Sequence, residues 1–198
     1  MIMINLELPK TIELHGENFA IRFDFRVILE IIIMLNDPSL DNDDKAEALI
    51  EMFFVEPERI TDPKEAIDAC FRFIDCNSDR KANPGKKLVD WEQDFNYIIS
   101  PVTRVIGHDP RSDDYDPINN TGGFHWWSFV GAYMEISSDC LFSQIVSIRD
   151  KQARGKKLEK HEREWLRRNG DLVKIRTKYS DAENDLIDAW TKGVKPNG

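Results

Sequence analysis

The sequence predicts a mainly α-helical protein with a small N-terminal β-hairpin, and two kinds of pattern carry that prediction. Near the N-terminus apolar residues alternate with polar ones, which is the two-residue period of β-strands. From residue 24 onward apolar residues recur at helical spacing, and several of these stretches open with an aspartate in a capping position.

The hairpin is expected on the two sides of the polar segment His15-Gly16-Glu17-Asn18. Ile12 and Leu14 alternate with polar residues before this segment, and the same alternation runs from Phe19 to Phe23 after it. A turn between two such strands gives a short β-hairpin.

Three helices are expected before residue 76. The first is capped by Asp24, covers RVILEIIIML and ends before Pro38, because a residue that precedes proline is pushed out of the helical region. A second pattern begins at Asp41, and a third opens at Asp62 with proline in its first turn. Cys70 lies on the inner face of the third pattern, so we expect it in the core.

A fourth helix is expected from Asp90 to Gly107, after an exposed polar loop at residues 76–87. Pro101 lies inside this pattern and removes one backbone donor, so we expect a kink or a break there. The next stretch, 108–123, has no periodicity and is rich in Asp, Pro and Gly. It divides the chain into an N-terminal part, 1–107, and a C-terminal helical part, 124–198, which we expect to pack as one unit.

The C-terminal part starts with FHWWSFVGAYMEI, followed by a helix that Ser138 or Asp139 could cap. Leu141, Ile145 and Ile148 are expected inside that helix. Gly155 and Gly170 bracket a charged helix with a thin apolar stripe.

The tail contains two further helical patterns. One surrounds Leu172 and Ile175, and the other opens with a capping box from Ser180 to Glu183. Leu186, Ile187 and Trp190 follow that box at helical spacing.

The aromatic cluster FHWWSF is predicted to be core. On a helix its rings wrap most of the cylinder, which favours burial between other helices over a groove for a ligand or partner, the alternative for the Trp pair. Gly131 is expected to let another helix come close. The candidate core residues are Phe124, Trp126, Trp127, Phe129 and Tyr133.

Charge is segregated along the chain. Residues 149–178 hold twelve Lys or Arg against five Asp or Glu, a balance of +7, while the whole chain carries −9. Such a stretch suits an acidic protein partner, self-association between unlike ends of neighbouring copies, or nucleic acid, and it can equally be a solvated helical face. Nucleic acid is less favoured because the remaining chain repels phosphate. The candidate partner surface comprises Arg149, Lys151, Arg154, Lys156, Lys157, Lys160, Arg163, Arg167 and Arg168.

The sequence does not predict an enzyme. The four histidines lie in four different segments, no phosphate-binding glycine motif is present, and the acidic run from Asp37 to Asp43 lacks the glycine and glutamate of a calcium loop. No catalytic residue, cofactor or metal is therefore expected. The three cysteines have no CxxC spacing and are expected to be reduced thiols.

No apolar run is long enough for a membrane span, and the N-terminus does not have the pattern of a signal peptide, so we expect neither a membrane nor an export route.

The order and spacing of several motifs resemble the bacteriophage "gene product fifteen" family of tailed phages and prophages of Gram-positive bacteria. The likeness runs from Ile12 to Tyr179 and is most specific in Glu92-Gln93-Asp94, in His125-Trp126-Trp127, and from Ile148-Arg149 to Lys157-Leu158. The chain departs from the commoner pattern in Pro101 and in the Asp- and Pro-rich loop before the Trp pair.

The resemblance implies a tail-morphogenesis protein of the phage or prophage. The first hypothesis is a tail-assembly chaperone that binds the tape-measure protein or other tail proteins in the host bacterial cytoplasm. Association with further copies of itself, as a homo-oligomer, is a second kind of interaction that this hypothesis allows. The chaperone would use apolar grooves flanked by the basic 149–168 surface. The alternatives are a minor structural protein retained in the virion tail and a nucleic-acid-binding helical protein. The family implies no catalytic residue.

Overall fold

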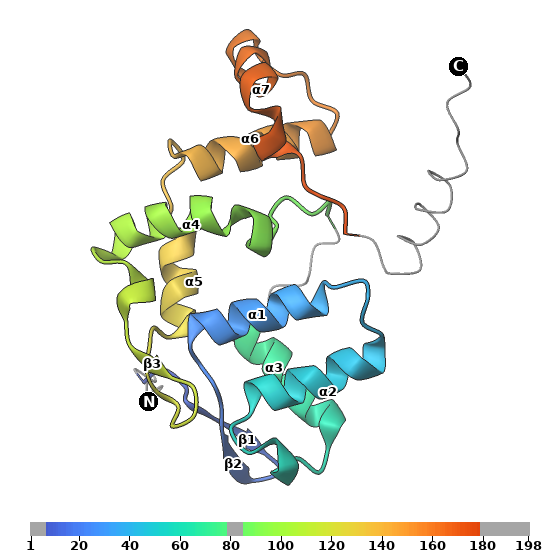
Figure 1. The fold of residues 1–198 in the computed structure, drawn as a ribbon, viewed down its shortest axis with the longest axis vertical. Helices are drawn as coiled ribbons and strands as arrows, with labels where there is room; N and C mark the ends of the chain where they lie inside the picture. The colour runs from blue at the N-terminus through green and yellow to red at the C-terminus, as the bar shows by residue number, and fades with distance from the viewer. Residues whose placement is uncertain (1–6, 79–84, 179–198) are drawn as a thin grey trace, which may run out of the picture.

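The computed structural model describes residues 7–78 and 85–178, in which the chain forms seven α-helices and two small β-hairpins (Figure 1). The predicted class, mainly α with a small N-terminal hairpin, is confirmed. The elements in chain order are β1 (Thr11–Leu14), β2 (Glu17–Ala20), α1 (Phe25–Leu35), α2 (Asn42–Phe53), the short 3-10 helix η1 (Pro57–Arg59), α3 (Pro63–Ile74), α4 (Trp91–Ile106), a second 3-10 helix η2 (Pro110–Ser112), β3 (Tyr115–Asp116), β4 (Thr121–Gly122), α5 (Trp126–Met134), α6 (Leu141–Ala153) and α7 (Lys160–Val173).

The N-terminal hairpin is tighter than the sequence suggests. Leu14 pairs directly with Glu17, so the turn consists of His15 and Gly16 alone. Both residues have positive φ, 50° and 84°, which two-residue hairpin turns of the primed types require. Glu17 and Asn18, expected in the turn, belong to β2.

The first three helices start at the aspartates that the sequence marks as caps. The side chains of Asp24, Asp41 and Asp62 each accept hydrogen bonds from backbone N–H groups in the first turn of α1, α2 and α3. These groups have no partner inside the helix, so the caps satisfy them. The helices then pack in chain order, α1 on α2 and α2 on α3.

The fourth helix begins at the predicted cap, Asp90, and ends at the predicted Gly107, whose φ of 86° is left-handed. Of the kink or break expected at Pro101, the break does not occur, because α4 continues through it to Ile106. Pro101 and its neighbour Val102 are buried, so packing keeps the helix together where the proline removes a backbone hydrogen bond.

The ends of α6 and α7 differ from the prediction. Cys140, and not Ser138 or Asp139, caps α6, with its sulfur 3.4 Å from the N–H of Ser143. Leu141, expected inside, is thus the first residue of the helix and is 43% exposed, whereas Ile145 and Ile148 are buried as expected.

The charged helix α7 starts later than Gly155 because Glu159 and Glu162 form a capping box. It also continues past Gly170, with Asn169 alone in a non-helical conformation. Leu172 thus belongs to α7, whereas Ile175 lies beyond its end. The capping box predicted at Ser180 and the helix after it lie outside the described residues.

The aperiodic stretch 108–123 contains a second hairpin that the sequence does not predict. Its strands β3 and β4 have two residues each, which is too short for an alternating pattern to be recognised. Across this stretch α5 packs against α1 and α4. The division of the chain at this point stays a prediction.

One hydrophobic core joins β1, β2 and α1 to α5, and it extends to Cys140 and Phe142 at the start of α6. Figure 1 shows α6 and α7 at one end of the long axis and the hairpin β1–β2 at the other, with α2 close to it. Within the described residues, no helix has the length and apolar character needed to cross a membrane.

Candidate partner-binding surfaces

The two tryptophans of FHWWSF close the end of another helix. Nε1 of Trp126 donates to the carbonyl of Ile74, and Nε1 of Trp127 donates to the carbonyl of Phe73, both at 2.9 Å. Ile74 is the last residue of α3, where helical carbonyls lack an intrahelical partner. The two indole hydrogen bonds of the Trp pair therefore attach α5 to α3.

His125 caps α5, a role that the sequence does not reveal because histidine is not among the preferred capping residues. Its Nδ1 accepts from the N–H of Trp127 at 3.0 Å, and its Nε2 lies 2.9 Å from the carbonyl of Pro9. A carbonyl only accepts, so the ring is neutral and carries its proton on Nε2. Burial lowers the pKa of His125 below its usual value, because the charged form would lose its hydration.

A buried carboxylate links the start of α1 to the start of α5. Asp24 is fully buried, and its Oδ2 accepts from the N–H of Phe124 at 2.8 Å while Arg26 pairs with both of its oxygens. The backbones of Phe23 and Phe25 exchange hydrogen bonds with Trp126 and Phe124. The segment before α1 and the segment before α5 thus run side by side.

The candidate core residues all face the hydrophobic core. Trp126 and Phe129 are buried, while Phe124, Trp127 and Tyr133 are partly buried against the core. Phe129 stacks on Phe25 with 4.7 Å between ring centres.

Gly131 does not have the expected role of admitting another helix. It is exposed, and a methyl group placed at its Cα would meet nothing within 4 Å.

Arg149 is not part of an exposed surface, which corrects the prediction that placed it there. Its side chain is 4% exposed and forms a two-point ion pair with the fully buried Asp94, at 2.5 and 3.0 Å. Its other hydrogen bonds reach the carbonyls of Leu88, Leu172 and Val173. All five guanidinium N–H groups are therefore used, which explains how a charge is tolerated inside the protein.

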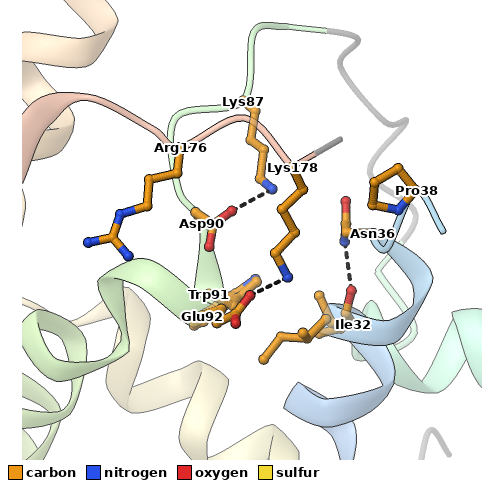
Figure 2. Close-up of a pocket in the computed structure, with 10 residues that line it drawn as sticks. Ile32, Asn36, Pro38, Lys87, Asp90, Trp91, Glu92, Arg176 and Lys178 are labelled. Carbon is orange, nitrogen blue, oxygen red and sulfur yellow. Dashed lines mark hydrogen bonds and ion pairs between the residues drawn. The ribbon is translucent and has the colours of Figure 1, made fainter. Parts of the chain in front are cut away.

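Glu92, Gln93 and Asp94 each hold a different part of the chain beyond residue 148. Asp94 binds Arg149 on α6. The side chain of Gln93 donates to the carbonyl of Lys174 and accepts from the N–H of Arg176, at 2.9 and 3.0 Å. Glu92 pairs with Lys178, as Figure 2 shows. This short run at the start of α4 therefore fastens α6 and residues 174–178 by side chains.

The remaining basic residues of the predicted partner surface lie at the end of α6 and along α7. Lys151 is half-buried and pairs with the buried Glu162 at 2.5 Å, and Arg154 pairs with Asp150 on the same helix at 2.7 Å. The other six are exposed, and no ion pair involving them is found in the part of the chain that the structure describes. We call them the basic face: Lys156, Lys157, Lys160, Arg163, Arg167 and Arg168.

Three hollows meet at Ile32 on α1. The first is polar and lies between α1, the start of α4 and residues 176–178. Figure 2 shows Lys178 paired with Glu92, and Lys87 paired with Asp90 on its own segment. The second, of about 680 Å³, is lined by α1, α2 and α3 and includes Phe71, which is 43% exposed. The third, of about 540 Å³, lies beside Trp126 and includes Met134, which is 64% exposed.

The second and third hollows share Ile32, Ile74 and Asp75, so they are adjacent. We call the two together the apolar trough. Sequence reasoning missed it because its walls come from five helices, α1 to α5, and only their packing brings those walls together.

One group of described residues could hold a cation. Ligand atoms of His15, Asp62 and Glu65 all lie within 4.8 Å of one another. Nε2 of His15 already contacts both carboxylates, at 3.3 and 2.7 Å, and the group fastens the hairpin turn to the start of α3. The sequence separation of these residues concealed the group.

The cysteines are free thiols. Burial raises the pKa of Cys70 to about 12 and is the main reason that the pKa of Cys76 rises to about 11. Since the thiolate is the reactive form of cysteine, these two side chains are poorly suited to nucleophilic chemistry.

In a comparison with known families, a family model described as "Bacteriophage Gp15 protein" matches residues 4–175 of the chain. No curated protein and no solved structure matches the chain.

Proposed function

The chain belongs to the Bacteriophage Gp15 protein family, and from that membership we propose that it acts in phage tail morphogenesis, as an assembly chaperone that binds the tape-measure protein. It would do so in the host cytoplasm while the tail is built. The family assignment itself establishes only a phage-associated protein.

The observation that carries the proposal is the apolar trough. Exposed apolar patches that are hollowed and lined by several helices are typical of sites that receive an amphipathic helix. Phe71 and Met134 lie in the two parts of the trough with 43% and 64% of their surface exposed. A helical segment of a long tail protein could cover both side chains at once.

The trough and the basic face belong to different elements. α1 to α5 supply the described residues that line the trough, together with the segment after α3. The basic face lies on α7 and the segment before it. Of these two surfaces, we assign the helix-binding role to the trough.

The experiment is retention of the co-expressed tape-measure protein by the tagged full chain. We expect retention by the unaltered protein and its loss in Phe71→Asp and Met134→Asp, because a charge in the trough must be desolvated when a helix covers it. Leu141→Asp is the matched control, since Leu141 is also 43% exposed but does not line the trough.

Failure of the unaltered chain to retain the tape-measure protein would overturn the proposed function. Retention by the two trough variants equal to that of the control would leave the function standing and remove the trough as its site. Mass spectrometry of purified virions adds a second readout, in which a chaperone is expected to be scarce and a minor tail component to be abundant.

A further inference from the structure

The two ends of the molecule carry opposite charge on helices of similar length. The acidic face of α2 comprises Asp41, Asp43, Asp44, Glu47 and Glu51, all exposed. Lys45 is the only basic residue between Asp41 and Phe53. At the other end is the basic face, which runs along α7 and the segment before it. With 12 and 14 residues, α2 and α7 are about 18 and 21 Å long.

From this arrangement we propose that the basic face binds the acidic face of a second copy of this chain, so that copies associate head to tail. Figure 1 places α7 at one end of the long axis and α2 far from it, next to the hairpin, so the two faces do not meet within one molecule. They meet only between molecules.

Both faces consist of exposed charged side chains. Over residues 7–78 and 85–178, no ion pair is found for the five acidic residues of α2 or for the six basic residues of the basic face. On α2, Asp43, Glu47 and Glu51 follow each other at a spacing of four, which puts them on one stripe. Lys160, Arg163 and Arg167, which follow each other at spacings of three and four, share a stripe on α7. A helix laid along a helix can therefore form several pairs together.

The acidic face leaves the apolar trough free. Asn42, Lys45, Ala46 and Leu49 are the residues of α2 that line the trough. At 100° per residue they lie on the side of the helix opposite Asp43, Glu47 and Glu51. A second copy seated on α2 would then not cover the trough, and this inference does not depend on what the trough binds.

A second copy fits the basic face better than nucleic acid does. The chain as a whole carries −9, and this net negative charge opposes the binding of a polyanion. A second copy instead brings an acidic helix of matching length. Because the two faces are different, the contact is heterologous, and its repetition gives an open chain or a ring rather than a two-fold dimer.

The test is sedimentation velocity of the nuclease-treated full chain over a range of concentrations and ionic strengths. We expect association beyond the dimer at low salt and its loss at high salt, because exposed charges are screened. Two variants each neutralise one face. The first is Lys160→Gln with Arg163→Gln and Arg167→Gln, and the second is Asp43→Asn with Asp44→Asn and Glu47→Gln.

Each variant alone should sediment as a monomer at low salt, whereas an equimolar mixture should stop at the dimer, since each partner keeps one intact face. Arg72→Gln with Arg104→Gln, which neutralises exposed charges on α3 and α4, should associate like the unaltered chain. The proposal is overturned if the unaltered chain is monomeric at low salt, if only one of the two variants loses association, or if the mixture does not form a dimer.

Discussion

Trp126 and Trp127 each donate an indole N–H to a carbonyl at the end of α3, but the two carbonyls differ in the other hydrogen bonds that they accept. The carbonyl of Phe73 also accepts from the N–H of Cys76, at 3.0 Å. The carbonyl of Ile74 has the indole of Trp126 as its one strong donor among the described residues, besides a weak contact of 3.9 Å to the thiol of Cys76. Removing one N–H therefore has different consequences at the two positions.

We expect Trp126→Phe to cost up to about 1–3 kcal/mol more than Trp127→Phe in the free energy of unfolding, because it removes the strong donor of the half-buried Ile74 carbonyl. Urea denaturation of the two variants measures this difference. Equal losses would mean that ring volume, and not the hydrogen bond to Ile74, determines the effect. Trp127→Ala is expected to cost about 3–5 kcal/mol if the ring acts as core.

Arg149 and Arg154 lie five residues apart and differ in their environment. Arg149→Met leaves the carboxylate of Asp94 buried and unpaired, which typically costs about 3–5 kcal/mol. Arg154→Met removes an exposed pair within one helix, for which about 0.3–0.5 kcal/mol is typical.

Arg149→Lys should recover little of the loss, since a lysine cannot offer five donors in a planar array. Thermal unfolding ranks the three variants. A lysine variant as stable as the unaltered chain would contradict the role given to the guanidinium geometry.

At the scale of one element, a Gly→Ala substitution should change the stability of the protein in opposite directions just before α5 and in the middle of α5. Gly123 has a φ of 79°, and a methyl group there would lie 2.3 Å from Oδ2 of Asp24, so Gly123→Ala should destabilise the protein. Gly131 is helical and has open space, so Gly131→Ala should stabilise it by up to about 1 kcal/mol. Urea midpoints that shift in opposite directions would bear this out, and a destabilising Gly131→Ala would contradict it.

The helices that the sequence located best begin with a side-chain cap of a standard type. Asp24, Asp41, Asp62 and Asp90 each open a helix as predicted, because capping is a local interaction between residues a few positions apart. The start of α5 was not predicted to depend on His125, because that cap works only when Pro9 orients the ring from the far side. Local rules cannot supply such a partner.

The candidate surfaces were predictable to a smaller extent. Composition alone indicated the basic stretch, and six of its nine proposed residues lie on the basic face. Nothing in the sequence distinguishes Arg149 from the arginines of α7, since its burial follows from Asp94, which is 55 residues away. The apolar trough likewise depends on how α1, α3 and α5 pack, which no local pattern encodes.

For the whole molecule, stability should depend on pH in two ranges. The folded-state pKa of His125 lies below its usual 6.5, so the unfolded chain takes up the proton first. Stability contributed by the neutral ring is therefore full above about pH 6.5 and is lost as the pH falls, at no more than about 1.4 kcal/mol per pH unit for one proton.

The second range lies below pH 3.8, where carboxylates with lowered pKa begin to be protonated in the unfolded chain. Asp109 is the clearest case, because the side chain of Arg111 holds its pKa at about 2. Its contribution is present above pH 3.8 and disappears as the pH falls through about 2.

Unfolding by urea between pH 7 and pH 5 tests the first range. His125→Asn keeps an acceptor at the cap and should flatten the pH dependence there, although it lowers stability overall. An unchanged slope in this variant would assign the effect to another group.

The ion pair between Arg149 and Asp94 also has a consequence for synthesis. Two of the carbonyls around Arg149 belong to Leu172 and Val173, which the ribosome adds 23 and 24 residues after it. Until they emerge, α6 cannot bury its arginine with every donor satisfied, although most of the core formed by α1 to α5 has already been synthesised. The nascent chain therefore completes its fold in two steps, and a product released before residue 173 would keep α6 undocked.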